Sequence, residues 1–459
     1  MRYCFVMLLV LAKIVIASPV ILEVKNKVIT VNGKKTTVAI IEQPDGTWGY
    51  WGKVNESFDV IVKNKLAEST MIHWHGLILP NNQDGVSGLT NPDIKPGGEY
   101  HFKFPLVQSG TYWMHSHDGL QLQNMVVAPL IIESGNDNKN QQVVVMFQDY
   151  TKQAAHKILT GLHSNDGDAT HDMDGMAGMQ GMDMGDEMQM DLNDVKYDAY
   201  LTNYHDNTNP QITQVKAGSI VRLRFINAAS ASNFWINLGK LKGSLIAVDG
   251  FPVQPLGGNK FQLAMGQRLD ILVTIPKSGG SFPILGQVEG LTSQTGLVLT
   301  TEKRIKRFTI ADNSRQAAPS LNYNQELKLH SVESREFSAG KLYKFKLSGN
   351  MKTYNWSINN QIWPDITPLK IKRGETVQFE FDNETMMSHP MHLHGYNFKI
   401  ISINGKRVDG AIRDTILVMP HSKVTVEFVA DYDGKWMLHC HTLYHMHRGM
   451  MTYIEVIPN

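Results

Sequence analysis

Cysteine is almost absent from this chain: its 459 residues include only Cys4 and Cys440. Cys4 lies in an N-terminal segment with the pattern of a secretory signal, so only Cys440 is expected in the processed protein. A single cysteine cannot form an internal disulfide, and a free thiol is a liability in an oxidising compartment. Cys440 lies between His439 and His441. We therefore predict that Cys440 is a metal ligand rather than a buried apolar residue.

Long apolar runs are also scarce. The run at residues 5–16 is interrupted by Lys13 and is shorter than the ~20 residues that a membrane-spanning helix requires. Arg2 precedes the run, and residues 15–17 have the small-residue pattern of a cleavage site. We predict a cleaved signal peptide at residues 1–17, no membrane span, and a periplasmic or secreted location. Because no twin-arginine pair precedes the run, we expect general secretory export and loading of metal afterwards.

The chain also lacks an excess of charge of one sign. It has 44 Lys and Arg residues against 43 Asp and Glu residues, a formal net charge of +1. This balance gives no electrostatic reason to expect nucleic acid or an anionic membrane as a partner. Hydrophobic residues make up 42% of the chain, which is typical of a globular protein with a substantial core. The length is sufficient for more than one domain.

Helical periodicity over long segments is absent. In its place are short runs rich in β-branched and aromatic residues, bounded by Gly, Pro, Asn and Asp. Several of these runs alternate between apolar and polar residues, as half-buried strands do. The clearest runs are residues 58–62, 100–104, 221–225, 377–381 and 424–428. The pattern predicts an all-β chain built from β-sandwiches.

Two parts of the chain share one order of features: a strand, a turn glycine, an aromatic strand and a His-x-His pair. The first part runs from Gly97 to His117 and the second from Lys423 to His441. The middle third has similar strands without the histidine pairs. A duplicated sandwich explains this repetition. We predict three sandwich domains, at residues 18–135, 140–310 and 320–459.

An insert at residues 164–191 within the second domain departs from this pattern. It consists mainly of methionine, glycine and aspartate, without the aliphatic residues that would let methionine pack in a core. Thioether sulfur is a soft ligand that suits Cu(I), so the insert is a candidate copper-binding segment. A solvated linker without a binding role is the alternative. The residues concerned are His171, Met173, Met176, Met179, Met182, Met184, Met188 and Met190.

Four histidine clusters are the candidate metal-binding motifs of the chain. They lie at residues 73–75, 115–117, 389–394 and 439–445, and they contain ten of the 18 histidines. Histidines at i and i+2 project from the same face of a strand, whereas Cys440 projects from the opposite face. One strand can therefore contact two metal centres. Cys440, His445 and Met450 supply mixed soft ligands of the kind found in a blue-copper site.

With these four motifs in order over essentially the whole mature chain, the sequence resembles the three-domain multicopper oxidases, the family of laccases, ferroxidases and cuprous oxidases. Residues 221–227, 249–252 and 265–270 fit the family's middle domain. Residues 197–200, 229–235 and 443–450 are most similar to bacterial copper-resistance members. The resemblance implies three cupredoxin-like Greek-key β-sandwich domains. It also implies an enzyme that couples one-electron oxidation of a donor to four-electron reduction of O2 to water.

The resemblance further implies four copper ions and their ligands. The type 1 copper would be held by His389, Cys440 and His445 with Met450 as the axial ligand, a position for which Met451 is the rival. The type 2 copper would be held by His73 and His392. The type 3 pair would be held by His75, His115, His117, His394, His439 and His441. Since two motifs lie in the first third and two in the last, this trinuclear cluster is expected between domains one and three.

Two positions bear on proton delivery and electron entry. Asp84 matches a family carboxylate credited with proton delivery to oxygen, although an Asp-Gly turn alone would explain it. The residue after the second blue-copper histidine is often Glu in relatives, but here it is Met446, followed by His447. His447 could substitute, or it could be an exposed loop histidine. We expect electrons to enter at an exposed edge of His445.

The motifs do not specify the electron donor. We expect Cu(I) first, Fe(II) next and phenols as accessory donors, with O2 as the acceptor and the protein as a monomer. The alternative function is a copper-sequestering protein that acts through its Met-rich insert. A copper nitrite reductase is a third candidate, but such enzymes usually complete their site between subunits, whereas this chain carries a full ligand set.

Overall fold

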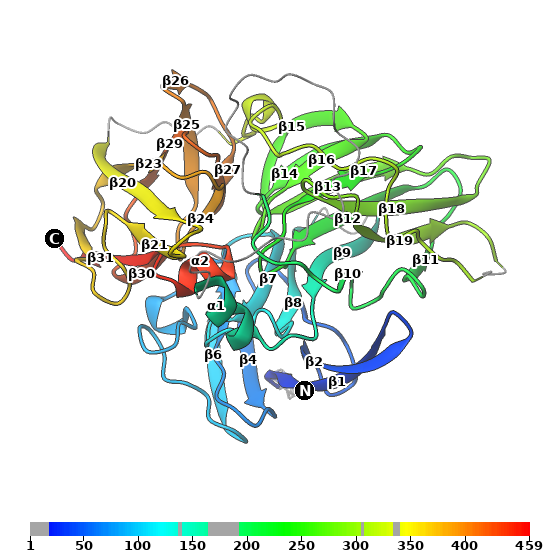
Figure 1. The fold of residues 1–459 in the computed structure, drawn as a ribbon, viewed down its shortest axis with the longest axis horizontal. Helices are drawn as coiled ribbons and strands as arrows, with labels where there is room; N and C mark the ends of the chain where they lie inside the picture. The colour runs from blue at the N-terminus through cyan, green and yellow to red at the C-terminus, as the bar shows by residue number, and fades with distance from the viewer. Residues whose placement is uncertain (1–17, 136–139, 164–191, 304–306, 334–339) are drawn as a thin grey trace, which may run out of the picture.

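In the computed structural model the described residues are 18–135, 140–163, 192–303, 307–333 and 340–459. The predicted signal peptide at 1–17 and the Met-rich insert at 164–191 lie outside the described residues. Figure 1 shows three groups of strands, which follow one another along the chain from blue through green to red. Among the described residues, no helix has both the length and the apolar character needed to cross a membrane.

The first group consists of two four-stranded sheets, in the orders β2-β1-β4-β6 and β3-β8-β7-β5. In β4, buried and less buried residues alternate along the strand, as the sequence predicts for a sandwich. Phe58, for example, packs its ring 4.7 Å from the rings of both Trp74 and Phe104. The strands are β1 Val20–Val31, β2 Lys34–Glu42, β3 Tyr50–Lys53, β4 Ser57–Asn64, β5 Ile72–His75, β6 Glu99–Pro105, β7 Gly110–Ser116 and β8 Val127–Glu133.

The second group consists of a six-stranded sheet, β10-β9-β12-β17-β14-β15, and a five-stranded sheet, β11-β19-β18-β13-β16. Its helix α1, Ala155–His163, directly precedes the Met-rich insert. The strands are β9 Gln141–Tyr150, β10 Ala199–Thr202, β11 Ile212–Gln214, β12 Ile220–Asn227, β13 Phe234–Asn237, β14 Gly243–Val248, β15 Phe251–Gly258, β16 Lys260–Leu263, β17 Arg268–Thr274, β18 Ser281–Val288 and β19 Gln294–Thr300.

The third group pairs a sheet in the order β21-β20-β23-β29-β25-β26, with β27 beside β25, against the sheet β22-β31-β30-β24-β28. Helix α2, Leu443–His447, follows β30. The strands are β20 Lys341–Asn350, β21 Asn355–Ile358, β22 Leu369–Lys372, β23 Thr376–Asn383, β24 His389–Leu393, β25 Phe398–Ile403, β26 Lys406–Arg407, β27 Ile412–Arg413, β28 Thr415–Val418, β29 Lys423–Val429, β30 Gly434–Cys440 and β31 Met451–Ile457.

The all-β prediction is confirmed. Each of the five runs chosen from the sequence lies within a strand, namely β4, β6, β12, β23 or β29. The repeated order of features is also visible, because β6 leads to β7 in the first group as β29 leads to β30 in the third. Short 3-10 helices at Asn81–Gln83 and Glu326–Lys328 complete the regular structure of the described residues.

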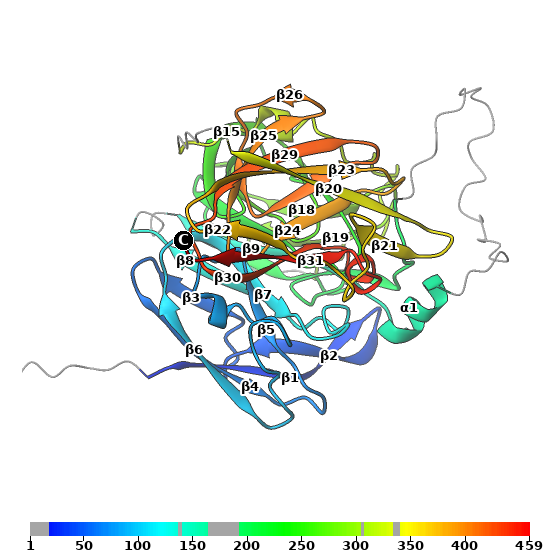
Figure 2. The ribbon, with the colours of Figure 1, turned by 90° about the vertical axis from the view of Figure 1, so that its left-hand side faces the viewer.

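Strand register brings the histidine motifs together. On β5 and β7, His73 lies directly opposite His115. On β24 and β30, His392 lies directly opposite His439. Directly opposed residues of antiparallel strands have their Cβ atoms only about 5 Å apart. Figure 2 shows β5 and β7 of the first group beneath β24 and β30 of the third, so the two strand pairs face each other across the junction.

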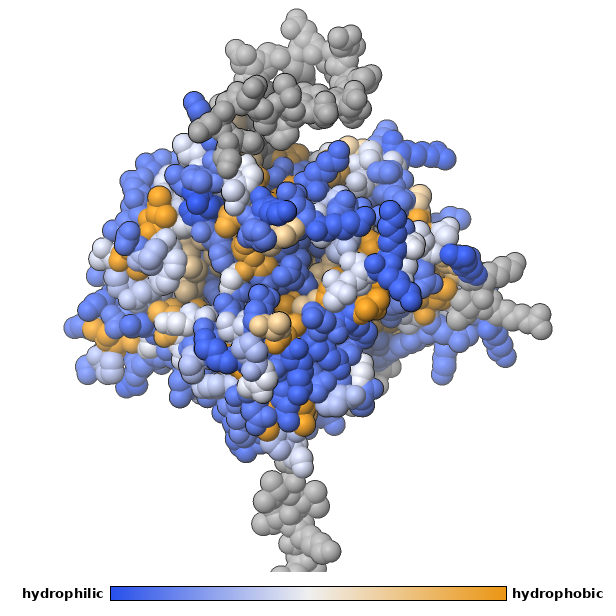
Figure 3. Space-filling view, turned by 60° about the horizontal axis from the view of Figure 1, so that its bottom comes forward, coloured by the Kyte–Doolittle hydropathy of each residue, from blue (hydrophilic) through white to orange (hydrophobic). Residues whose placement is uncertain are grey.

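The face of the molecule drawn in Figure 3 shows no comparable gathering of residues. Figure 3 shows a face on which hydrophobic residues are scattered among hydrophilic ones. Dispersed apolar residues of this kind are normal for a folded protein and identify no partner. The residues that indicate a function lie in the interior.

Candidate metal centres

Three ligand atoms converge at the end of β24, the end of β30 and in α2. The Sγ atom of Cys440 lies 3.7 Å from Nδ1 of His389 and 3.7 Å from Nδ1 of His445. The two Nδ1 atoms are 3.1 Å apart. All three side chains are fully buried. One thiol and two imidazoles with atoms facing one point form the three-ligand set of a blue-copper centre.

Met450 lies beside this set. The backbone N–H of Cys440 donates to the carbonyl of Met450, and the N–H of Met450 donates to the carbonyl of His445. Met450 is fully buried, whereas Met451 begins β31 and is half-buried. The backbone bonds hold Met450 next to both Cys440 and His445. These observations favour Met450 over Met451 as the axial ligand.

Aromatic packing keeps water away from this centre. The ring of Trp356 stacks on His445 with centroids 4.1 Å apart, and its centroid lies 5.3 Å from that of His389. Trp356 on β21 is itself fully buried. The phenol of Tyr354 completes the enclosure with its ring 5.9 Å from His445.

The expectation that His445 presents an exposed edge is wrong. His445 is fully buried, and its Nε2 atom lies 2.9 Å from Oδ2 of Asp194, whose side chain is 1% exposed. The Tyr354 hydroxyl donates a hydrogen bond to the same carboxylate oxygen. Burial lowers the pKa of the free His445 imidazole, but Asp194 and Cys440 outweigh this and raise its pKa to about 9. No local pattern distinguishes Asp194, which follows the Met-rich insert among other acidic residues.

Helix α2, which carries His445, is fixed to the other two groups of strands. The N–H of Leu443 donates to the carbonyl of Ser230 at 2.9 Å. The Tyr444 hydroxyl donates to Oε1 of Gln123 at 2.8 Å. Residues on either side of the domain junction therefore set the position of this ligand.

The other eight histidines of the motifs form one cluster. His73 stacks on His394 and His75 stacks on His392, both with centroids 3.7 Å apart. The ring of His441 lies 5.1 Å from that of His75. Each pair joins a residue of the first group of strands to one of the third. The members are His73, His75, His115, His117, His392, His394, His439 and His441, of which His117 alone is half-buried.

Hydrogen bonds to one ring nitrogen show, for five of these histidines, which nitrogen is left for a metal. The Nδ1–H groups of four rings donate to backbone carbonyls, which leaves Nε2 as the nitrogen with the lone pair. These bonds are His73 to Asp84, His115 to Ser116, His392 to Asp414 and His439 to Cys440. The ring of His75 is turned the other way: its Nε2 atom is hydrogen-bonded to Oδ1 of Asp414, and its Nδ1 atom has no partner.

The unpartnered nitrogens are the main evidence that this cluster binds metal. Buried polar atoms without a hydrogen-bond partner are rare and need an explanation. Here they gather in one place, which a group of metal ions bound at that place would explain. They are Nε2 of His73, His115, His117 and His392, Nδ1 of His75, and both ring nitrogens of His441.

Burial keeps seven of these rings neutral, the form that binds metal. Desolvation lowers the pKa of His439 to about 4. It lowers the pKa of six neighbours well below the ordinary range, and the neighbouring imidazoles lower it further. Those neighbours are His75, His115, His117, His392, His394 and His441.

Comparison with known proteins agrees with this geometry. Three sequence models described as multicopper oxidase match residues 20–137, 141–313 and 337–459. The chain belongs to the multicopper oxidase family.

The relatives include bacterial copper-resistance proteins. The oxidase is 28% identical to the multicopper oxidase MmcO of Mycobacterium tuberculosis, over 88% of this chain and 80% of that protein. It is 28% identical to copper resistance protein A of Escherichia coli, over 88% of this chain and 87% of that protein. The fold matches a multicopper oxidase from Campylobacter jejuni, a metallo-oxidase, with a TM-score of 0.72 at 21% identity, covering 96% of this chain and 91% of the other.

In this oxidase Asp84 lies against the histidine cluster. It is fully buried, and its Oδ2 accepts a hydrogen bond from Nδ1 of His394 at 2.9 Å. Its backbone carbonyl accepts from Nδ1 of His73, and its Oδ1 atom has no hydrogen-bond partner. Asp84 thus follows a turn, as local chemistry predicts, and also contacts two predicted ligands. A role in proton delivery stays a prediction.

Met446 and His447 lie on α2. His447 is exposed, as one of the two interpretations predicted, but it ends a helix instead of lying in a loop. Its Nε2 atom donates to the carbonyl of Gly119 at 2.6 Å. Met446 packs against an apolar cluster that includes Leu443. Neither of these two side chains is a carboxylate.

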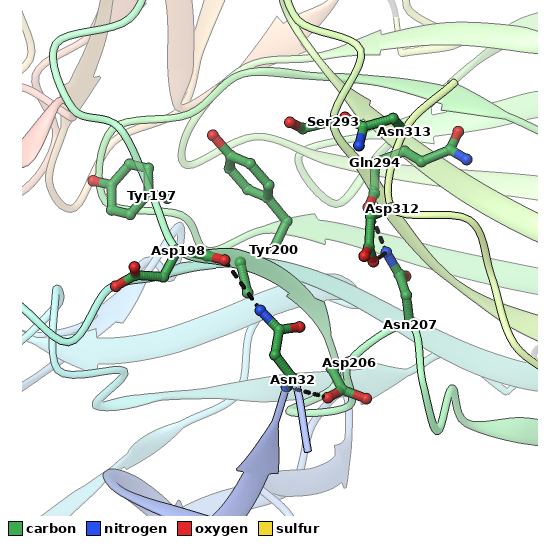
Figure 4. A pocket seen from close by; sticks show the side chains of 11 residues that line it. Asn32, Tyr197, Asp198, Tyr200, Asp206, Asn207, Ser293, Gln294, Asp312 and Asn313 are labelled. Atoms are coloured by element: carbon green, nitrogen blue, oxygen red, sulfur yellow. Dashed lines mark hydrogen bonds between the residues drawn. The ribbon is translucent and has the colours of Figure 1, made fainter. Parts of the chain in front are cut away.

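A polar cavity of about 170 Å³ between β1 and the second group of strands is a different feature. Figure 4 shows Asp312 accepting a hydrogen bond from Asn207, and Asn32 bonded to Asp198 and Asp206. None of the predicted copper ligands lines this cavity. Within the described residues, every group of three side chains close enough to share a metal ion contains at least two members of the histidine motifs.

Proposed function

We propose that this oxidase oxidises a one-electron donor, Cu(I) before Fe(II), with phenols as accessory donors, and reduces O2 to two water molecules. The observation that carries the proposal is the placement of Cys440, the last residue of β30, between His439 and His441. Cys440 faces the site with His389, while the histidines on either side face the buried cluster. Four electrons from four donors and four protons balance the reduction of one O2 molecule.

Four copper ions would supply this chemistry, by accepting electrons singly at the type 1 site and by binding and reducing O2 at the trinuclear cluster. The type 1 site would use His389, Cys440, His445 and Met450, the type 2 site His73 and His392, and the type 3 pair the remaining six histidines. The neutral, buried rings and their unpartnered nitrogens fit this assignment. The residues of the protein position the ligands, exclude water and hold the protons of the ring nitrogens.

The surroundings of His445 favour a cationic donor. Asp194 places a carboxylate 2.9 Å from the imidazole, where it attracts positive charge. Arg448, three residues after His445, contacts Nδ1 of His163 at 2.9 Å. His163 ends α1 and Asp194 follows the insert, so the residues on both sides of the Met-rich segment lie near the type 1 site (Figures 1 and 2). This placement supports delivery of Cu(I) by the insert.

We further propose that the enzyme is exported, that residues 1–17 are removed, and that it acts as a monomer in the periplasm or outside the cell. A role in copper resistance is consistent with relatives named copper resistance protein A. Fe(II) remains the second donor, since a carboxylate is a suitable ligand for a harder cation. Copper sequestration through the insert is the alternative function.

Oxygen-electrode kinetics on copper-loaded protein test the proposal. Cu(I), Fe(II) and a phenol are compared as donors, with the full chain and with a chain lacking residues 171–190. We expect the highest kcat/KM for Cu(I) and a selective loss of Cu(I) turnover in the deletion. If the deletion abolishes copper tolerance of the host but leaves Cu(I)-driven O2 consumption unchanged, sequestration is the better explanation. Absence of O2 consumption with every donor would reject the oxidase proposal.

A further inference from the structure

Arg268, the first residue of β17, is a fully buried arginine behind the histidine cluster. All five N–H groups of a guanidinium are donors, and here each has an acceptor. Nε donates to the carbonyl of Thr111 at 3.0 Å. Nη1 donates to the Gly266 carbonyl and to Oδ1 of Asp414, and Nη2 donates to the Asp249 carbonyl and to Oδ2 of Asp414. The position of this side chain is therefore fully determined.

The acceptors belong to all three groups of strands. Thr111 is in β7 of the first group, Gly266 and Asp249 are in the second, and Asp414 lies between β27 and β28 of the third. The pair with Asp414 is bidentate, with distances of 2.7 and 2.6 Å. Bidentate pairs of this kind fix orientation as well as position. Arg268 thus determines where the Asp414 carboxylate points.

Asp414 in turn holds His75. Its Oδ1 atom lies 3.1 Å from Nε2 of His75 and also accepts from the Thr415 hydroxyl at 2.9 Å. In a neutral imidazole, the form that binds metal, one ring nitrogen carries the N–H and the other has the lone pair. A carboxylate can only accept, so that N–H must be on Nε2. The lone pair is then on Nδ1, which points into the cluster without a partner.

Two glycines show how closely Arg268, Asp414 and the turn before β17 approach the histidine rings. A Cβ atom on Gly76, next to His75, would lie 2.4 Å from Nη2 of Arg268 and 2.5 Å from Oδ2 of Asp414. A Cβ atom on Gly266 would lie 2.9 Å from the ring of His441 and 3.2 Å from that of His75. Only glycine permits this contact. The turn before β17 is therefore pressed directly against two predicted copper ligands.

We propose that Arg268 is a positioning residue for the trinuclear cluster: through Asp414 it fixes the ring orientation and the tautomer of His75, so that this ring presents Nδ1 to the cluster. The inference rests on the proposed assignment of His75 to the type 3 pair. It gives the middle domain, which supplies no predicted ligand, a part in building the oxygen site. An outer-shell partner of a metal-bound histidine typically contributes about 10–100-fold to metal affinity.

Arg413 is a matched control for a purely structural role. It is also fully buried, and it pairs with Asp249 at 3.1 Å and with Glu326 at 2.9 Å. It shares Asp249 with Arg268, but its hydrogen bonds and ion pairs reach no histidine. Replacing either arginine removes a buried charge from the same network. Only the replacement of Arg268 also releases Asp414.

The test measures copper content and spectra of Arg268→Met, Arg268→Lys, Asp414→Asn and Arg413→Met after identical copper loading. The blue colour reports the type 1 site, whose ligands lie outside this network. The type 2 paramagnetic resonance signal and the near-ultraviolet absorption of the type 3 pair report the cluster. A wild-type protein that failed to show these signals would reject the proposed function itself, before any variant is compared.

We expect Arg268→Met and Asp414→Asn to stay blue and to lose at least tenfold in cluster copper affinity, while Arg413→Met keeps the full cluster. Arg268→Lys, which retains the charge but not the bidentate pair, should be intermediate. If Arg268→Met does not fold, Asp414→Asn compared with Arg413→Met decides the matter. Full cluster copper in Asp414→Asn, or equal loss in Arg413→Met, would overturn the proposal.

Discussion

Nε2 of His445 lies 2.9 Å from Oδ2 of Asp194, and both side chains are buried. The two residues are separated by 251 positions in the sequence (445 − 194) and come from different groups of strands. The Asp194 carboxylate thus lies against the Nε2 edge of the imidazole, whereas the Nδ1 atom faces Cys440. This arrangement makes the charge of Asp194 the first variable to test in electron entry.

Asp194→Asn should lower kcat/KM for Cu(I) and Fe(II) by roughly tenfold, equivalent to about 1.4 kcal/mol, because the attraction for cations is removed while the shape is kept. Turnover of a neutral phenol should change much less. Steady-state O2 consumption measures both. Tyr354→Phe is the control, since it loses the hydroxyl bonded to Asp194 but keeps the carboxylate. Equal losses for cations and phenol would contradict an electrostatic role.

Cys440→Ser should abolish the blue colour and turnover while the fold survives. A serine hydroxyl is a poor substitute for a thiolate ligand, and the strand would no longer link the two centres through sulfur. Circular dichroism should show an unchanged β-sheet spectrum, and copper analysis should show loss of type 1 copper. Retained turnover with the donors named above would disprove the electron path through Cys440.

Asp84→Asn should keep most of the copper but slow the reduction of O2. The amide can still accept from Nδ1 of His394, but it cannot carry a proton as a carboxylate does. Re-oxidation of the fully reduced enzyme by O2, followed by stopped-flow absorbance, isolates this step. Asp84→Glu should recover part of the rate. If Asp84→Asn re-oxidises at the wild-type rate, Asp84 is a turn and positioning residue only.

The copper-free protein should lose stability below a pH of about 6.5, the ordinary histidine pKa. Burial lowers the pKa of His75, His115, His392 and other cluster rings in the folded chain. The unfolded chain therefore binds more protons below this pH, and each such group lowers the free energy of unfolding by up to about 1.4 kcal/mol per pH unit. Urea unfolding between pH 5 and 8 measures the slope.

In that experiment His445 should change the free energy of unfolding with pH in the opposite direction. Its pKa is raised to about 9, so its contribution to stability is fully present below 6.5 and is lost as the pH rises through 9. The effect of His445 alone on the free energy of unfolding is too small to cancel the combined opposite effect of the cluster histidines. Copper-loaded protein should show a higher stability throughout, because copper binds the folded ligand set. A copper-free protein whose stability is flat from pH 8 to 5 would contradict the buried, neutral state of the cluster.

The copper ligands could be predicted because their signal is local. Two histidines at i and i+2 face the same side of a strand, and Cys440 between one such pair faces the opposite side, wherever that strand lies. The same holds for the strands themselves, whose alternation of buried residues needs only the neighbouring positions. The partners Asp194, Asp414 and Arg268 could not be predicted in this way. Each is a common residue without a local pattern, brought to its histidine from a distant part of the chain.

The sequence by itself therefore determined the β-strands, the two faces of the His439–His441 segment and the chemical types of the ligands, because these follow from periodicity and side-chain chemistry. Only the tertiary structure decided that His445 is buried against Asp194 and that His75 is turned by Asp414 and Arg268. The physical reason is that a ring's exposure, charge and tautomer depend on what lies against its second nitrogen. Packing between domains brings that neighbour to the ring from a distant part of the chain, so no single segment of the sequence reveals it.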